Sequence, residues 1–450
     1  MTAPLLERVQ ANSLTLGDRP ALIAGADTIL WRDLWPMAQG LAARLRAAGA
    51  GPVALSGSPD RVWLPAAFLA CLIAGRPYLP LDPSLPLGRQ RELAAGLGAQ
   101  WLEAGEALEG ISSGLSCSPA EDEGRLAYLL FTSGTTGAPK PVGISVRNLE
   151  SFLRWAVTLP GLADSAGGTA VGQAAWSFDL SVADLYLALT QGGTHVALTE
   201  GEKGDYPALL RRLEACSTSL LVTTPTFLRL CLAEPGFSPK RLPYLRTVFS
   251  CGEALPPAAA RRLLDRFPGC TLLNAYGPTE AACAVTAIPI SQDMCAGPLP
   301  IGRAGEGAVS VTLEEGELIL TGESVAPAFG GRYATGDLSY VKEGLLYWAG
   351  RKDHQLKYKG YRIEPAEIEG VLESLPGVER AAVLPRRGPG GEVRGLTAVV
   401  EGPAHTETLR TELARLLAPC KCPGQWVRLD RIPLTPNGKC DRKRLEEMIQ

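Results

Sequence analysis

The stretch Tyr128-Leu-Leu-Phe-Thr-Ser-Gly-Thr-Thr-Gly-Ala-Pro-Lys140 joins an apolar run to a loop rich in hydroxyls and glycine, and it ends on a lysine. Glycine lets backbone N–H groups turn toward an anion, and the hydroxyls add further donors. The composition therefore predicts a loop that binds a polyphosphate. It is not a Walker loop, because the GK[ST] ending is missing and Val142–Ser145 predicts a strand where a helix would follow. For this stretch alone, an ordinary turn is the alternative.

Helical patterns and short extended runs alternate on both sides of this loop, which favours an α/β fold with largely parallel sheets. The predicted helices are 41–48, 63–74, 209–215 and 258–267, and the predicted strands are 52–55, 78–81, 219–224 and 271–275.

The pattern changes after Glu314, where short strands at 317–321 and 345–348 predict an antiparallel section. A compact module follows Gly350-Arg-Lys-Asp353, with helices expected at 365–375 and 407–417 and strands near 381–384 and 396–400. We place the domain boundary at Asp353, which gives domains 1–352 and 353–450. A single continuous domain is the alternative.

Charge and hydropathy exclude several classes of protein. The net charge is −3 and is spread without blocks, which argues against a nucleic-acid groove or a polybasic membrane patch. The longest uncharged run that we find, 185–199, is shorter than the roughly 20 apolar residues of a membrane-spanning helix. Glu7 and Arg8 interrupt the N-terminus before an apolar core forms, so we expect no secretory signal and a cytoplasmic protein.

The cysteines predict neither a disulfide framework nor a zinc site. The 11 cysteines are odd in number and dispersed, no CxxC occurs, and His195, His354 and His405 lie far apart in the sequence. Reduced and mostly buried thiols are the better interpretation.

Three further motifs place polar side chains after turns. In Asn274-Ala-Tyr-Gly-Pro-Thr-Glu280, Tyr276 offers a flat face for a base and Glu280 can hold a divalent ion. In Tyr333-Ala-Thr-Gly-Asp337, the acid can bind two ribose hydroxyls. Asn437-Gly-Lys439 carries a lysine on a turn. Each has an ordinary alternative when taken alone: a structural turn, an Asx-turn and a solvated surface charge.

Taken together and in this order, the motifs resemble those of the adenylate-forming superfamily of acyl-CoA synthetases, luciferases and amino-acid adenylation domains. The run Gly350-Arg-Lys-Asp-His-Gln-Leu-Lys-Tyr-Lys-Gly-Tyr-Arg-Ile-Glu364, with Ala366-Glu-Ile-Glu369 after it, looks like the hinge and following loop of that family. The resemblance covers roughly residues 15 to 445.

The resemblance implies a fold and a reaction. The expected fold is a large N-terminal part of stacked α/β subdomains with a small β-barrel-like section, plus a small mobile α+β C-terminal domain. The reaction first joins a carboxylate to the α-phosphate of ATP and releases pyrophosphate, and then passes the acyl group to a thiol.

The resemblance also assigns the nucleotide site. The β- and γ-phosphates of ATP would lie against Thr132, Ser133, Gly134, Thr135, Thr136, Gly137 and Lys140. Thr136 and Glu280 would bind Mg²⁺, and Thr279 would contact the α-phosphate. Tyr276 would stack on adenine, and Asn274 would lie beside the nucleotide. Asp337 and Arg351 would bind the ribose.

Three residues of the C-terminal part complete this assignment. Lys439 matches the catalytic lysine that bridges the substrate carboxylate and the α-phosphate. Asp353 matches the hinge about which the small domain rotates between the half-reactions. Gly360 lies where a pantetheine arm would require close approach of the backbone.

Trp176-Ser-Phe-Asp179 resembles the segment in which amino-acid adenylation enzymes place an Asp against the substrate ammonium. A buried carboxylate is selective for a cation because leaving it unpaired is costly. A helix N-cap is the alternative role of Asp179. The resemblance is closer still to D-alanyl carrier protein ligases, through Ser177–Tyr186, Thr223–Phe237 and Cys251-Gly-Glu253.

The implied pocket is small and apolar apart from Asp179, so we expect a small amino acid, alanine or its D-enantiomer. Its members would be Phe178, Leu180, Ala183, Val222, Phe249, Cys251, Gly252, Ala275, Cys283 and Ala284. Phe249 limits the space, and Cys251 lies where D-alanine ligases carry a cysteine beside the α-carbon.

No GG-x-S phosphopantetheine attachment site occurs, so the expected acceptor is a carrier protein in trans, and the enzyme is expected to be a monomer. Two alternatives stay open: an acyl- or aryl-CoA synthetase that uses free coenzyme A, which Asp179 disfavours, and a non-catalytic nucleotide-binding protein. Pro141, where the family usually has Gly, and a shortened span at 325–333 depart from the family pattern.

Overall fold

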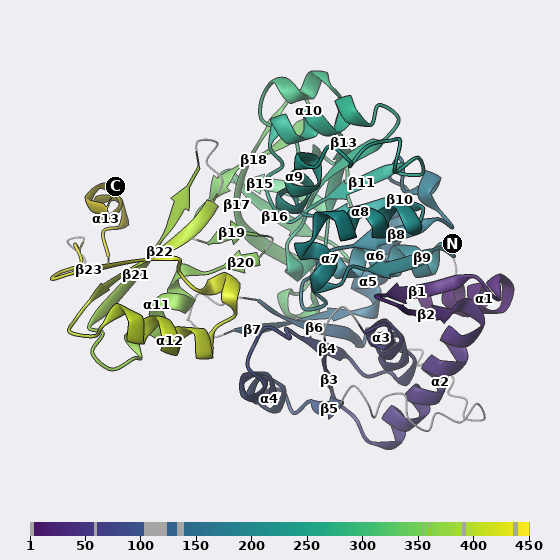
Figure 1. Ribbon diagram of the computed structural model, residues 1–450, viewed down its shortest axis with the longest axis horizontal. Helices are drawn as coiled ribbons and strands as arrows, with labels where there is room; N and C mark the ends of the chain where they lie inside the picture. Colours follow the sequence, from purple (N-terminus) through teal and green to yellow (C-terminus); the bar gives the residue numbers. More distant parts are fainter. Residues whose placement is uncertain are drawn as a thin grey trace. The chain divides into compact units, whose positions relative to one another are not determined.

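The computed structural model describes residues 4–57, 61–102, 124–132, 139–353, 355–359, 361–388, 393–434 and 440–449 (Figure 1). The chain forms two compact units. The larger comprises residues 1–82, 91–130 and 142–352, and the smaller comprises 83–90, 131–141 and 353–450.

An eight-stranded sheet is the largest sheet of the part that the structure describes, in the order β13-β12-β11-β10-β8-β9-β1-β2. The strands from β12 to β1 pair in parallel, and β13 and β2 add antiparallel edges. The strands are β1 (Pro20–Ala24), β2 (Asp27–Leu30), β8 (Thr169–Gly172), β9 (Thr194–Ala197), β10 (Thr218–Thr223), β11 (Thr247–Ser250), β12 (Thr271–Tyr276) and β13 (Thr286–Pro289).

Successive side chains of each strand point to opposite faces of the sheet, and both faces are buried. Val222, Phe249 and Ala275 lie in one buried cluster, and their neighbours Leu221 and Val248 lie in another. The strands therefore consist of nearly continuous apolar residues, as a parallel sheet covered on two sides requires.

Two sets of helices provide these clusters. The first cluster takes buried residues from α1 (Leu5–Leu16), α2 (Trp31–Ala47), α3 (Trp63–Ala74), α5 (Val146–Ala156) and α6 (Leu180–Thr190), and the second from α8 (Tyr206–Ala215), α9 (Pro225–Ala233) and α10 (Pro257–Arg266). The short helix α7 (Glu200–Gly204) precedes α8.

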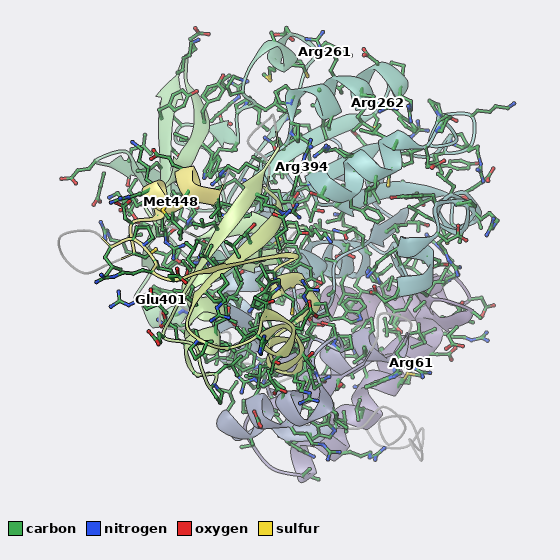
Figure 2. The ribbon with its side chains drawn as sticks, turned by 60° about the vertical axis from the view of Figure 1, so that its left-hand side comes forward. Arg61, Arg261, Arg262, Arg394, Glu401 and Met448 are labelled. Carbon is green, nitrogen blue, oxygen red and sulfur yellow. The ribbon has the colours of Figure 1, made fainter. Side chains whose placement is uncertain are left out.

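Helix α10 shows how the sequence sets this arrangement. Its Ala259, Ala260 and Leu263 are buried, whereas Arg261 and Arg262 are exposed on the other side of the helix, as Figure 2 shows. An apolar stripe at helical spacing therefore faces the sheet and the charges face solvent. No helix among the described residues has the length and apolar character needed to cross a bilayer.

A second sheet of five strands has the order β5-β3-β4-β6-β7. Its strands are β3 (Val53–Ser56), β4 (Tyr78–Leu81), β5 (Gln100–Leu102), β6 (Leu126–Thr132) and β7 (Lys140–Ser145), with α4 (Leu87–Gly96) between β4 and β5 in the sequence. Pro141 lies in β7, which is an edge strand and tolerates a residue without an N–H. The departure at Pro141 is therefore compatible with the strand.

An antiparallel sheet in the order β14-β18-β17-β16-β15 follows in the sequence. Its strands are β14 (Gly302–Arg303), β15 (Ser310–Glu314), β16 (Glu317–Thr321), β17 (Arg332–Lys342) and β18 (Leu345–Arg351). The shortened span before β17 holds a single 3-10 turn, η4 (Pro327–Phe329). Further 3-10 turns are η1 (Ala163–Ser165), η2 (Thr279–Ala281), η3 (Asp293–Ala296) and, in the smaller unit, η5 (Pro419–Lys421).

The smaller unit is α+β in the residues described. It holds the hairpin β19 (Leu356–Tyr358) and β20 (Tyr361–Ile363), a three-stranded sheet of β21 (Arg380–Arg387), β22 (Val393–Glu401) and β23 (Gln425–Leu429), and the helices α11 (Pro365–Glu373), α12 (Thr406–Leu416) and α13 (Arg442–Ile449). Arg394 and Glu401 mark the two ends of β22, and Met448 lies near the end of α13 (Figure 2). The smaller unit has an apolar cluster of its own, which includes Ile368, Val383 and Leu413.

The predicted α/β class, with an antiparallel section and a separate α+β part, is confirmed. The helix predicted at 41–48 is longer in the structure, because α2 begins at Trp31 and runs through Pro36. Proline disfavours a helix interior. The stripe of Trp31, Leu34, Trp35 and Ala38, which is buried at helical spacing, outweighs that cost.

Candidate active site

The predicted substrate pocket lies at the carboxyl ends of β10, β11 and β12, on the face that α6 covers. Val222 pairs with Phe249 across β10 and β11. Cys251 follows β11 directly, and its N–H donates a 3.1 Å hydrogen bond to the carbonyl of Thr223. Ligand sites of open parallel sheets form at this edge.

All the apolar pocket candidates join one buried cluster. Phe178 packs against it, and its members include Leu180, Ala183, Val222, Phe249, Cys251, Ala275, Cys283 and Ala284. The sequence brings them together from α6, from three neighbouring strands and from the loop after β12.

Gly252 has a structural reason to be glycine. Its φ is +96°, and a Cβ atom there would lie 3.3 Å from the Phe178 ring. A side chain at this position would be strained and would press on Phe178. Gly252 therefore permits the close approach of two segments that the sequence assigns to the pocket.

Asp179 occupies the N-cap position of α6, but its side chain makes no capping hydrogen bond. Its Oδ2 instead accepts a 2.5 Å hydrogen bond from the hydroxyl of Thr279, and the residue is 7% exposed. The N-cap interpretation of the Asp179 carboxylate is therefore wrong. The carboxylate faces the loop that carries Thr279 and Glu280.

Asp337 is the centre of a buried polar cluster. Its Oδ2 accepts a 2.6 Å hydrogen bond from the Tyr276 hydroxyl. Its Oδ1 accepts hydrogen bonds from Trp348 Nε1 at 2.9 Å and from Arg351 Nη1 at 3.1 Å. The N–H of Ser339, which an Asx-turn would direct at this carboxylate, donates instead to the carbonyl of Gly316 at 2.8 Å, so the carboxylate forms no Asx-turn. A carboxylate has about four acceptor positions, so the three bonds leave room for about one more.

Tyr276 is held by this cluster. Burial, with the neighbouring Asp337 carboxylate as the second cause, raises the pKa of Tyr276 well above its ordinary value. The phenol is therefore neutral at physiological pH and serves as the donor to Asp337. This hydrogen bond fixes one end of the ring that the family resemblance assigns to adenine.

Glu280, the predicted magnesium ligand, is buried at the start of the segment after β12. It is 5% exposed, and its backbone carbonyl accepts a 2.8 Å hydrogen bond from the N–H of Ala326. The described residues hold no group of three or more His, Cys, Asp or Glu side chains placed for a metal ion. Mg²⁺ bound to nucleotides needs only one or two carboxylates beside phosphate oxygens and water.

Asn274 has a structural contact besides its predicted place in the nucleotide site. Its amide nitrogen donates a 2.7 Å hydrogen bond to the carbonyl of Pro300, and the residue is 3% exposed. This bond ties the end of β12 to the segment before β14.

Several predicted residues lie outside the described part of the chain. They are Ser133, Gly134, Thr135, Thr136 and Gly137 of the phosphate loop, and Gly360 and Lys439. The ends of the phosphate loop are described, and the hydroxyl of Thr132 donates a 3.4 Å hydrogen bond to the carbonyl of Lys140. Asp353 accepts a 3.2 Å hydrogen bond from the N–H of Gln355.

Trp348 and Tyr128 contact predicted site segments but were not among the predicted site residues. Trp348 donates to Asp337, and the Tyr128 hydroxyl donates a 3.3 Å hydrogen bond to the carbonyl of Ala282. Strand pairing brings Trp348 to this point, since β17 and β18 also place Asp337 opposite Arg351. A single sequence carries no local signal for such pairing.

Solved structures share this fold. The adenylation domain AlmE of Vibrio cholerae, solved with glycyl-adenosine-5'-phosphate, aligns over 100% of this chain and 98% of its own with a TM-score of 0.83 and 21% identity. The amide bond synthetase McbA of Marinactinospora thermotolerans aligns over 99% and 100% of the two chains with a TM-score of 0.83 and 21% identity. The architecture is that of an adenylation domain.

Family models and curated relatives identify the family to which this chain belongs. A model described as AMP-binding enzyme matches residues 9–109 and 98–328, and the AMP-binding enzyme C-terminal domain matches residues 367–439. The D-alanine--D-alanyl carrier protein ligase of Bacillus licheniformis is 32% identical and covers 99% of both chains. The enzyme of that name from Bacillus cereus strain AH187 is 35% identical over 84% of this chain and 86% of its own. This chain belongs to the family of AMP-binding enzymes.

Proposed function

We propose that this enzyme activates a small amino acid with ATP as an aminoacyl-AMP and transfers it to the phosphopantetheine thiol of a carrier protein. The observation that carries the proposal is the buried Asp179 carboxylate next to Phe178 and Leu180 of the apolar cluster assigned to the substrate pocket. A buried carboxylate is selective for a cation, and a substrate ammonium is such a cation. The names of the curated relatives favour D-alanine as the amino acid.

The first half-reaction brings two anions together. A carboxylate oxygen of the amino acid attacks the α-phosphorus, and the bond from that phosphorus to the pyrophosphate oxygen breaks. In this proposal, Lys439 neutralises the approaching carboxylate and the α-phosphate, and the loop from Thr132 to Lys140 holds the leaving phosphates. Mg²⁺, held by Glu280 and Thr136, would neutralise phosphate charge when bound.

The described residues position the other reactant groups. Asp337, fixed by Tyr276, Trp348 and Arg351, presents its remaining acceptor position to a ribose hydroxyl. Thr279, beside Asp179, connects the nucleotide motif to the amino-acid pocket. The family resemblance assigns Thr279 to the α-phosphate, and Thr279 precedes Glu280 in the same short turn.

In the second half-reaction, the phosphopantetheine thiolate attacks the acyl carbon, and AMP leaves as the acyl–oxygen bond to its phosphate breaks. Asp353 is the proposed hinge for the change between the two steps, and Gly360 is the proposed point of approach for the pantetheine arm. The carrier is a separate phosphopantetheinylated protein, expected to be small and acidic. We further propose that the enzyme is a monomer.

We place the reaction in the cytoplasm, where ATP is available. The ten cysteines in the described residues form no disulfide with one another, as a reducing compartment favours.

The runner-up is a synthetase that passes the acyl group to free coenzyme A. Asp179 disfavours a substrate without an ammonium group, but it does not act on the acceptor. The experiment that separates the two supplies D-alanine and ATP with either a phosphopantetheinylated D-alanyl carrier protein or coenzyme A. Intact-protein and small-molecule mass spectrometry then identify the thioester. We expect the carrier to gain one alanyl group, and alanyl-CoA as the main product would contradict the proposal.

A further inference from the structure

The loop that joins β12 to β13 contains a strained turn at Ala282. This residue has φ +71° and ψ −71°, and the N–H of Cys283 donates a 3.1 Å hydrogen bond to the carbonyl of Ala281. The dihedral angles and the bond from residue i+2 to residue i define a γ-turn of the rarer, positive-φ kind, which is strained for any residue with a side chain. Ala282 is fully buried.

The rest of this loop is tied down at identified points. The N–H of Val285 donates to the carbonyl of Tyr276 at 2.8 Å, which closes the loop at its base. A Cβ atom on Gly277 would lie 2.5 Å from Cα of Ala284, so the two sides of the loop are in backbone contact. The direction of the chain between Glu280 and Cys283 is therefore set by the turn at Ala282.

Tyr128 secures the turn from β6. Its hydroxyl donates a 3.3 Å hydrogen bond to the carbonyl of Ala282, and the side chain is fully buried. Burial, followed by the nearby Cys283 and Asp179, raises the pKa of Tyr128, so the phenol stays protonated as a donor.

Cys283 is the pocket residue that the turn places. It is 2% exposed and lies in the same buried cluster as Cys251 and Leu180. Its side chain is therefore packed among the residues assigned to the substrate pocket. A small shift of Cys283 would change the space available to the substrate side chain.

We propose that Ala282 and Tyr128 act together as a positioning pair that holds Cys283 against the substrate and restricts the pocket to a small side chain. The inference rests on the proposed function. Without the Tyr128 hydroxyl, Ala282 can relax toward negative φ and carry Cys283 with it. Glycine adopts positive φ without strain, so a glycine at 282 keeps the turn even when the hydroxyl is absent.

The test compares kcat/KM for D-alanine and D-valine in ATP–pyrophosphate exchange. We expect Tyr128→Phe to lower the D-alanine preference about tenfold, the effect of one steric contact in an apolar pocket. We expect Ala282→Gly alone to keep the preference of the unsubstituted chain. The double variant Tyr128→Phe, Ala282→Gly should have a D-alanine preference within about threefold of that of the unsubstituted chain.

Tyr186→Phe is the matched control. Its hydroxyl lies 3.0 Å from the hydroxyl of Tyr78 in the same aromatic cluster, and the residue is also fully buried. We expect this control to leave the preference unchanged even if it lowers the melting temperature.

Two results would overturn the inference while leaving the proposed function intact: a preference in Tyr128→Phe equal to that of Tyr186→Phe, or no recovery in the double variant. If no amino acid supported pyrophosphate exchange by the unsubstituted chain, that result would instead contradict the proposed function and, with it, the inference.

Discussion

The hydroxyl of Thr279 donates a 2.5 Å hydrogen bond to the carboxylate of Asp179. The two residues are 100 positions apart in the sequence, one at the start of η2 and the other just before α6. The bond joins the motif proposed to hold the nucleotide to the residue proposed to hold the amino acid. The two substrates of the first half-reaction would therefore meet at this pair.

Asp179→Ala removes the proposed partner of the substrate ammonium. Loss of one member of a buried ion pair costs about 3 to 5 kcal/mol, so kcat/KM for D-alanine should fall at least about 100-fold. The measurement is amino-acid-dependent ATP–pyrophosphate exchange. Asp164→Ala, at an exposed acid, is the control and should leave kcat/KM unchanged. A loss of kcat/KM smaller than about threefold would show that Asp179 does not pair with the substrate ammonium.

Cys251→Ala opens space beside the proposed position of the substrate α-carbon. The thiol is 3% exposed and is held at the end of β11. We expect activity on L-alanine to rise relative to D-alanine by about tenfold, which corresponds to about 1.4 kcal/mol. The measurement is kcat/KM for both enantiomers. An unchanged ratio would mean that Cys251 does not contact the α-carbon.

Lys439→Ala should separate the half-reactions. Removing one cationic group from a site of developing negative charge lowers the rate by about 10² to 10³, so pyrophosphate exchange should be lost. Transfer of preformed alanyl-adenylate to the carrier should continue. Lys443→Ala, at an exposed lysine of α13, is the control for both measurements. Equal loss of exchange and transfer in Lys439→Ala would show that its assigned role is wrong.

Asp184 and His195 should stabilise the fold behind the pocket. Asp184 Oδ2 and His195 Nε2 are 3.0 Å apart, and the residues are 3% and 1% exposed. Asp184→Ala leaves the imidazole without this partner, which should lower the free energy of unfolding by about 1 to 3 kcal/mol. Urea denaturation measures the change. Glu214→Ala, which breaks an exposed pair with Arg241, should cost about 0 to 1 kcal/mol, and an equal loss in both variants would contradict the prediction.

Sequence pattern predicted the fold where local signals are strong. The apolar run at 63–74 is helix α3 with the predicted bounds, and the strand at 78–81 is β4. The sequence pattern did not predict the first part of α2, because Pro36 disfavours a helix there. Buried aromatic residues of α2 stabilise the helix in spite of the proline. Local propensity yields to packing when a long stripe of side chains is buried.

The polar contacts of the site depend on tertiary structure and could not be predicted from the sequence. Asp337 and Glu280 were found because they follow turns in motifs, whereas the bonds from Tyr276 and Trp348 to Asp337 require the sheets to be in place. The positive φ of Ala282 also has no local signal, because alanine disfavours that conformation. Tertiary contacts must hold such a residue.

ATP–pyrophosphate exchange with D-alanine, L-alanine, glycine, serine, phenylalanine and lysine tests the proposed function most directly. The pocket of Leu180, Ala183, Phe249 and Cys251 predicts the highest kcat/KM for D-alanine, weaker exchange with L-alanine, glycine and serine, and rejection of phenylalanine and lysine. Best activity on a large or charged amino acid, or exchange with none of the six, would contradict the account.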